Sequence, residues 1–195
     1  NLVRAVMGIE VGNGYLSNKQ YQMSLVEAVI KGAIDNGIYV LVDWQDFNAQ
    51  DHQSQAIEFF TYIAQTYGNN PHIIYEPFNE PLQVDWTSVV RPYHVAVVAA
   101  IRARDPDNVI VLGTPTWSQD VDLAANNPVS GINLCYTVHF YAGTHKQAFR
   151  DKMQAALNKG VCVFVTEYGT VNADGNGAVD QASTQEWYTY MDNNQ

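Results

Sequence analysis

Six short and almost uninterrupted apolar segments alternate with helix-like segments along this chain of 195 residues. The apolar segments lack the polar–apolar alternation of strands with one solvated face, so each is predicted to be a strand buried on both faces. They span residues 2–8, 38–44, 72–79, 109–113, 134–141 and 161–167. Because no two of these strands form a hairpin, the series predicts a parallel α/β sheet.

Helical periodicity fills most of the intervals between these strands. Apolar residues recur at three- and four-residue spacing in segments 20–36, 54–67, 87–104, 146–158 and about 180–192. The first of these segments ends at Asn36-Gly37, and two others stop at Gly68 and Gly160, as expected of helix C-caps. The strands are therefore expected to run in one direction, with their carboxyl ends along one edge of the sheet.

Two architectures contain such a sheet. An open doubly wound sheet typically carries a phosphate-binding turn after its first strand, and the glycines of residues 8–14 do not fit G-x-G-x-x-G. A closed (β/α)₈ TIM barrel instead gathers polar side chains at the carboxyl ends of its strands. We therefore predict one (β/α) barrel catalytic domain over residues 1–195, truncated to about six βα units, with the first and last strands missing. The polar positions are Arg4, Asp43, Asn79, Glu80, His139, Tyr141 and Glu167.

Charge and composition exclude several partners. The formal charge is −10, and the ten basic residues are scattered, so no nucleic-acid partner is expected. No apolar run approaches the roughly 20 residues of a membrane span, so no membrane partner is expected either. The 12 Tyr and 4 Trp are in the first place core residues, but such a surplus also suits stacking against sugar rings.

Cys135 and Cys162 lie in two different predicted strands. Cys135 lies four residues before His139 in one strand, so the two side chains should point to the same face. Cys162 lies five residues before Glu167 in the other strand, so those two should point to opposite faces. Because side chains alternate between the faces of a regular strand, one thiol should face the interior and the other the helices. We therefore expect no disulfide and interpret both cysteines as small buried hydrophobic residues.

Two glutamates stand at the carboxyl ends of two predicted strands. One strand ends in Asn79-Glu80-Pro81, and the other places Glu167 after an apolar run. Either glutamate alone is consistent with a solvated rim residue. Two carboxylates at one edge of a sheet, however, are the groups that split an acetal by acid/base and nucleophilic catalysis.

Other polar residues are predicted to support this pair. Arg4 would pair with Glu167, and Tyr141 would hydrogen-bond it, whereas His139 shares the parity of Tyr141. For His139 and Tyr141 the alternative interpretation is ordinary core packing. A metal site is also conceivable, but no H-x-H or H-E-x-x-H spacing occurs, so we expect no metal and no other cofactor. The residues of metal-ligand type are Asp43, His52, His139 and Glu167.

Together these motifs resemble those of the family 5 glycoside hydrolases over essentially the whole chain. The resemblance rests on Asn79-Glu80-Pro81, Thr166-Glu167-Tyr168-Gly169 and the HFYAGTH segment at 139–145, with support from residues 40–44 and 113–120. It implies a retaining double displacement in which Glu80 is the acid/base and Glu167 the nucleophile. It further implies substrate-binding or supporting roles for Arg4, Asn79, His139, Tyr141, Trp44, Gln45, Trp117 and Tyr15.

The chain departs from the family pattern at three places. The family usually has a substrate-binding histidine where this chain has Gln45, which can hydrogen-bond a hydroxyl but carries no proton or charge. Tyr168 stands where tryptophan is commoner. The tryptophan that stacks under the reacting sugar belongs to the family's last strand, which this chain does not include.

The resemblance implies an endo-β-1,4-glucanase that acts on β-glucan polysaccharide or oligosaccharide. We expect a monomer, and we expect it to be secreted, because polymeric substrates are normally met outside the cell. Two alternatives stay open at this point. One is the same chemistry on β-mannan or another β-glycan, and the other is a weakly active or non-catalytic carbohydrate-binding homologue.

Overall fold

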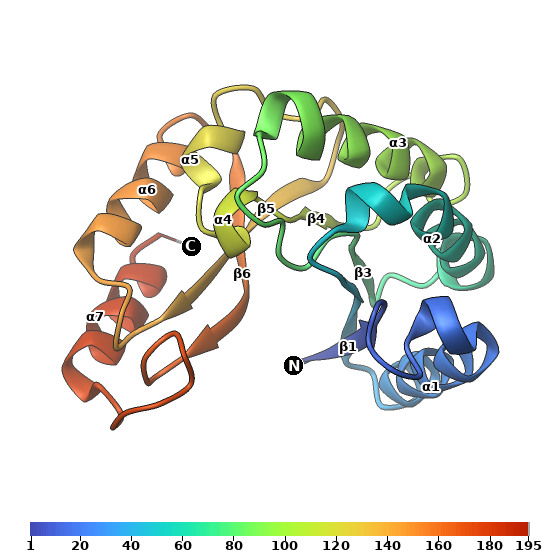
Figure 1. The fold of residues 1–195 in the computed structure, drawn as a ribbon, viewed down its shortest axis with the longest axis horizontal. Helices are drawn as coiled ribbons and strands as arrows, with labels where there is room; N and C mark the ends of the chain where they lie inside the picture. Colours follow the sequence, from blue (N-terminus) through green and yellow to red (C-terminus); the bar gives the residue numbers. More distant parts are fainter. Residues whose placement is uncertain (195) are drawn as a thin grey trace.

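The computed structural model describes residues 1–194 and contains one parallel sheet in the order β1-β2-β3-β4-β5-β6. The strands curl into an arc, and the helices cover its outer side (Figure 1). The predicted α/β barrel architecture with six strands is therefore confirmed. The strands are β1 (Leu2–Gly8), β2 (Tyr39–Gln45), β3 (Ile73–Glu76), β4 (Ile110–Leu112), β5 (Leu134–Tyr141) and β6 (Cys162–Gly169).

Five longer helices connect or follow the strands: α1 (Tyr15–Asp35), α2 (Gln53–Tyr67), α3 (Arg91–Arg102), α6 (Gln147–Leu157) and α7 (Gln181–Asp192). Each falls where helical periodicity predicted one, although α1 begins earlier and a π-helical turn, η2 (Trp86–Val90), precedes α3. Three short elements were not predicted: η1 (Ala49–His52), α4 (Pro115–Ser118) and α5 (Val121–Ala124). None of the helices within residues 1–194 combines the length and apolar character needed to cross a membrane.

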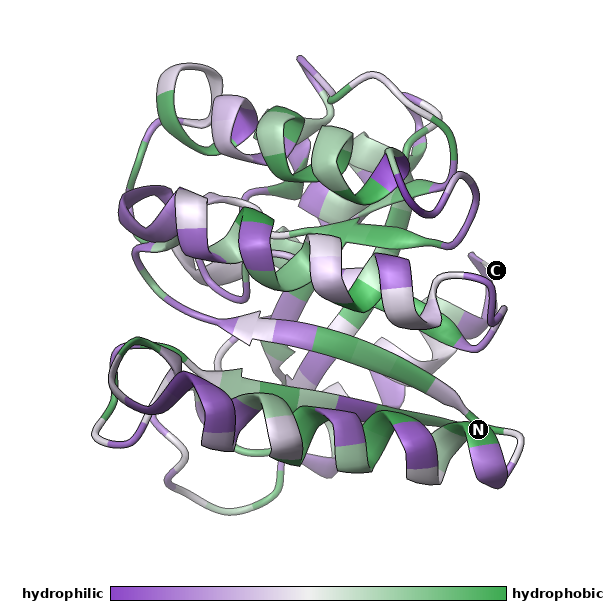
Figure 2. Ribbon diagram, turned by 90° about the vertical axis from the view of Figure 1, so that its right-hand side faces the viewer, coloured by the Kyte–Doolittle hydropathy of each residue, from purple (hydrophilic) through white to green (hydrophobic). Residues whose placement is uncertain are grey.

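The main core lies between the outer face of the sheet and the helices. Figure 2 shows mainly hydrophobic strands beneath helices whose turns alternate between hydrophobic and hydrophilic residues. A second, smaller cluster lies on the inner face and consists of Leu41, Ile74, Val111 and Cys135. The next inward side chains toward the carboxyl ends of β2 and β3 are Asp43 and Glu76. The small cluster therefore forms an apolar floor beneath the polar residues of the sheet edge.

Strand β3 ends at Glu76, three residues earlier than predicted. Pro77 follows directly and has no N–H to donate to a neighbouring strand, so the ladder stops there. The chain continues beside β2, because the amide N–H of Asn79 donates to the Trp44 carbonyl at 3.2 Å. Asn79 and Glu80 are thus presented on a loop that is still held against the sheet.

The prediction that the two cysteines stay unpaired was wrong. Cys135 and Cys162 are register partners on β5 and β6 and form a disulfide, with 4.5 Å between their Cα atoms. The register shifts by one residue between Thr137 and His139, which pairs with Glu167. This β-bulge inserts one extra residue into β6 and reverses side-chain parity between Cys162 and Glu167. Counting by twos along a regular strand therefore failed. Cys162 is also exposed rather than buried.

Reducing this disulfide should destabilise the protein. The bridge closes a loop with a sequence separation of 27 residues, for which the loop-closure model gives roughly 3.5 kcal/mol. We expect the midpoint of denaturant unfolding to fall when reductant is added, because exposed Cys162 is open to exchange. The Cys135→Ser/Cys162→Ser double variant should have the same unfolding midpoint as the reduced wild type, and added reductant should not change it. Equal stability of the oxidised and reduced wild type would contradict the prediction.

Candidate active site

Arg4 is the central cation of the polar sheet edge. It is the third residue of β1 rather than its last, and its long side chain spans the distance to the neighbouring strands. Its Nε donates to Glu76 at 2.7 Å, and one terminal nitrogen donates to Glu167 at 3.1 Å. The other terminal nitrogen donates to Asn79 Oδ1 at 2.7 Å and lies 3.3 Å from Asp43. Burial opposes this positive charge, but the three carboxylates outweigh burial and raise the pKa of Arg4.

The predicted pair of glutamates meets at this edge. One carboxylate oxygen of Glu80, one of Glu167 and a ring nitrogen of His139 all lie within 4.8 Å of one another. Glu80 is held by His139, whose Nδ1 lies 2.8 Å from Glu80 Oε1. Glu167 accepts a hydrogen bond from the Tyr141 hydroxyl at 2.7 Å. The structure thus brings six of the sequence-predicted residues together: Arg4, Asn79, Glu80, His139, Tyr141 and Glu167.

The loop that carries Glu80 is fastened to the segment that contains Trp117 and Ser118. The Ser118 hydroxyl donates to the Asn79 carbonyl at 2.7 Å, and the Trp117 amide donates to the Pro81 carbonyl at 2.8 Å. Gly113 permits close approach on this side, since a Cβ there would lie 2.1 Å from the Phe78 carbonyl oxygen. Glu80 is therefore positioned by backbone contacts as well as by its own side chain.

Two predicted cleft residues lie elsewhere. Trp44 is 0% exposed and Tyr15 is 2% exposed, and their rings pack edge to face against each other on the helix side of the sheet. Asp43 points inward in β2, so its successor Trp44 points outward. This corrects the prediction that Trp44 and Tyr15 line a substrate cleft.

Gln45 and Trp117 fit the predicted location better. Gln45 faces the same side as Asp43, and its Oε1 is buried without a hydrogen-bond partner among the described residues. Trp117 is 38% exposed and belongs to a run of three residues in the left-handed region, with φ values of 59°, 56° and 55° for Thr116, Trp117 and Ser118. Such backbone costs on the order of 1–3 kcal/mol per residue and persists only where surrounding contacts enforce it.

Sequence reasoning missed Glu76 and Thr166. Glu76 is completely buried in β3, and the Thr166 hydroxyl donates to it. Burial opposes ionisation of Glu76, but nearby His139 and Arg4 outweigh burial and lower its pKa. The signal was present, because a carboxylate within an apolar strand must have a partner. Thr166 gave no such signal, because it enters the site only through the bulge in β6.

The pKa values of Asp43 and His139 are both raised in this charge cluster, which favours a neutral Asp43 carboxyl but a charged His139 ring. Burial and the charge of Glu76 raise the pKa of Asp43 well above its usual range, although Arg4 opposes this. For His139, burial disfavours the charged ring, but contacts with Glu76 and Glu80 and the charge of Glu167 raise its pKa to about 9. The site therefore holds a protonated imidazole close to neutral pH.

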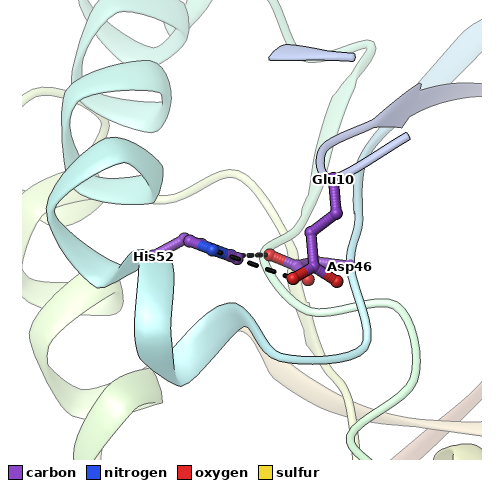
Figure 3. Close-up of side chains that lie close together, drawn as sticks. All are labelled: Glu10, Asp46 and His52. Atoms are coloured by element: carbon purple, nitrogen blue, oxygen red, sulfur yellow. Dashed lines mark hydrogen bonds and ion pairs between the residues drawn. The ribbon is translucent and has the colours of Figure 1, made fainter. Parts of the chain in front are cut away.

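A second cluster of charged residues lies beside the site and includes Glu10, Asp46 and His52 (Figure 3). His52 Nδ1 is 2.8 Å from Asp46 Oδ2, and its Nε2 is 3.9 Å from Glu10. Asp46 also accepts from the Trp44 indole N–H at 3.1 Å and the Asn48 amide at 2.9 Å. These contacts hold the loop after β2, whose Asp46 carbonyl accepts from the Glu80 amide at 3.4 Å.

Both clusters contain atom types that bind metals. In each, however, the ring nitrogens already lie against acceptors: His139 contacts Glu80 and Thr166, and His52 contacts Asp46 and Glu10. Asp46 is likewise supplied with hydrogen-bond donors. Binding a metal would break these contacts, so we assign both clusters as hydrogen-bonded networks.

The chain is similar to known proteins over its whole length. The model of the family described as cellulase (glycosyl hydrolase family 5) matches residues 1–195. The chain belongs to glycosyl hydrolase family 5. Endoglucanase Z of Dickeya dadantii is 50% identical over 195 residues, which are 100% of this chain and 46% of that protein. An endoglucanase of Clostridium saccharobutylicum is 44% identical and covers 98% of this chain, with 43% of its own length matched.

Solved structures have the same fold. A structure from Cytophaga hutchinsonii superposes with a TM-score of 0.97 at 46% identity and covers 99% of this chain and 63% of that chain. The catalytic domain of Thermobifida fusca endoglucanase Cel5A superposes with a TM-score of 0.91 at 33% identity, over 99% of this chain and 66% of that one. The chain thus spans less than half of these curated relatives and about two thirds of these structures.

The charge of His139 should make stability depend on pH. Its pKa is about 9 in the folded protein and about 6.5 when unfolded, so its contribution is complete below pH 6.5 and is lost as pH rises through 9. The full contribution is on the order of 3 kcal/mol. Chemical denaturation between these pH values should show falling stability for the wild type and a flatter profile for His139→Asn. A wild-type profile without this decline would contradict the prediction.

Proposed function

We propose that this chain carries the catalytic pair of a retaining endo-β-1,4-glucanase. The observation that supports this most directly is the approach of Glu80 and Glu167, with carboxylate oxygens within 4.8 Å. Retaining glycosidases place their two carboxyl groups about 5–5.5 Å apart, whereas inverting enzymes need about 6.5–9.5 Å to admit a water molecule. The relatives named endoglucanases support the assignment of substrate. So does the complex of a Thermobifida fusca Cel5A variant with cellotetraose.

In the proposed reaction a carboxylate oxygen of Glu167 attacks the anomeric carbon of the sugar. Glu80 gives its proton to the glycosidic oxygen, so the bond to the leaving sugar breaks and a glycosyl-enzyme ester forms. Glu80, now ionised, takes a proton from a water molecule that attacks the same carbon. The ester bond to Glu167 breaks, and the product keeps its anomeric configuration.

The neighbouring residues divide into two groups in this mechanism. Arg4 and Tyr141 orient Glu167 through hydrogen bonds of 3.1 and 2.7 Å. His139 holds Glu80 at 2.8 Å. The arrangement keeps one carboxyl group ready to attack while the other moves a proton.

Three further residues are proposed to contact the sugar. Asn79 Oδ1 accepts from Arg4, while its Nδ2 has no partner among the described residues. A sugar 2-hydroxyl would supply the missing acceptor, a contact that strengthens in the transition state. Gln45 offers a free amide oxygen, and Trp117 offers an exposed ring for stacking. Secretion, inferred from the polymeric substrate, belongs to the same proposal.

Replacing the glutamates should separate catalysis from binding. In the natural protein that contains this chain, Glu80→Gln should lower turnover of carboxymethylcellulose about 10²–10⁴-fold, the usual contribution of a positioned acid. Glu167→Ala should abolish turnover and leave cello-oligosaccharide binding within a few-fold, because the attacking oxygen is lost. Unchanged turnover in both variants would exclude this site. Faster wild-type hydrolysis of mannan than of carboxymethylcellulose would move the substrate assignment to β-mannan.

The stereochemistry of the product tests the mechanism independently. A double displacement on a β-1,4-linked oligosaccharide releases the β-anomer first, and the α-anomer appears only as the sugar mutarotates. Proton NMR of the anomeric signals during the first minutes of cellopentaose hydrolysis should show this order. Initial release of the α-anomer would indicate inversion and would rule out Glu167 as the nucleophile.

A further inference from the structure

Glu76 lies beneath the proposed catalytic pair and contacts neither glutamate directly in the described hydrogen bonds. Its side chain is fully buried, and its two oxygens have different partners. Oε2 accepts from Arg4 Nε at 2.7 Å, whereas Oε1 accepts from the Thr166 hydroxyl. One carboxylate is therefore shared between two hydrogen-bonded branches.

Each branch leads to one member of the catalytic pair. Through Arg4, the first branch reaches Glu167 at 3.1 Å. Through Thr166 the second reaches His139, whose Nε2 lies 2.9 Å from the hydroxyl oxygen and whose Nδ1 lies 2.8 Å from Glu80. Glu76 thus connects the positioning of the acid to that of the nucleophile.

The second branch also fixes where protons lie. A hydroxyl has one proton to donate, and an ionised carboxylate can only accept. Because Thr166 gives its proton to Glu76, it can only accept from His139, so Nε2 must carry a hydrogen. Nδ1 is then the nitrogen that faces Glu80. In the protonated ring, which prevails near neutral pH, Nδ1 donates to an oxygen of Glu80, and only the neutral ring, formed as pH rises through about 9, can accept from the protonated acid.

We propose that Glu76 is a positioning residue that holds the Nε2–H of His139 in place through Thr166 and holds Arg4 against the nucleophile. His139 then keeps Glu80 in place in both protonation states that the proposed reaction requires. This inference rests on the proposed function for its catalytic consequence, but the proton on Nε2 can be observed without turnover.

Other charged groups also face His139. Glu76 approaches from β3, Glu80 from the loop that follows it, and Glu167 from β6. Asp43 on β2 also interacts with His139 electrostatically, and Arg4 supplies the opposing positive charge from β1. The test must therefore separate the effect of Thr166 orientation from the general loss of one negative charge.

Glu76→Gln and Thr166→Val provide that separation. In Glu76→Gln the amide oxygen can still accept from Arg4, so the amide NH₂ faces Thr166 and reverses its hydroxyl. The Thr166 proton must then turn to Thr137 or to His139. With the charge of Glu76 also gone, the titration midpoint of His139 should fall from about 9 by roughly one pH unit or more. Thr166→Val keeps the charge of Glu76 but removes the hydroxyl, so the hydrogen on Nε2 should lose its acceptor and its slow solvent exchange.

Nitrogen-15 NMR of the natural protein reports both changes. The sequence has five histidines, and the signals of His139 are those absent from His139→Asn. For activity we expect kcat to fall about 10–100-fold in Glu76→Gln with KM within about threefold, since Glu76 is too deep to touch substrate. The alkaline limb of the pH profile should move to lower pH.

Asp105→Asn is the matched control. Asp105 is also a buried carboxylate and accepts from the Tyr75 hydroxyl at 2.6 Å, but it lies at the other end of β3 from Glu80. This variant should lose stability without changing the His139 signals or the pH profile. A folded Thr166→Val variant that keeps the wild-type Nε2–H signal and exchange, or a folded Glu76→Gln variant that keeps the wild-type titration midpoint of His139, would overturn the inference. Failure of Glu80→Gln to reduce turnover would overturn only the proposed function.

Discussion

The site depends on one partly buried guanidinium, that of Arg4. Arg4 balances three carboxylates, Asp43, Glu76 and Glu167, that come from three different strands. Buried charges of one sign would repel each other and force protonation if no cation stood among them. Because the guanidinium offers several donors in a rigid plane, a single side chain can offset part of this repulsion and orient all three members together.

The second constraint is a single extra residue in β6. The bulge opposite Val138 allows both Thr166 and Glu167 to reach interior partners, although adjacent residues of a regular strand point to opposite faces. The same irregularity brings Cys162 beside Cys135 below the site. The disulfide and the apolar floor thus brace the strand pair that delivers His139 and the nucleophile candidate.

The polar residues of this sheet edge lie in two layers, an inner buried layer and an outer layer that is partly exposed. Glu76 and His139 are almost completely buried, whereas Glu80 and Glu167 have side chains that are 15% and 29% exposed. The buried groups are fixed by partners on all sides, and the partly exposed groups remain open toward a ligand. A protein that must hold one carboxyl group ionised and let another exchange a proton gains from this layering, because the inner residues set orientation without meeting solvent.

The strands, the parallel sheet and the edge at which Glu80 and Glu167 meet could be predicted from the sequence, because apolar runs and strand ends follow from local composition. The sequence also identified Arg4, His139 and Tyr141. The tertiary structure alone decided which side chains of neighbouring strands share a face. A bulge leaves no mark on an apolar pattern, so the disulfide and Thr166 could not be foreseen. Trp44 and Tyr15 were misplaced for a related reason, since an aromatic residue near a strand end fits either face until register is known. Glu76 acquired its role only when folding placed Arg4 and Thr166 at its two oxygens.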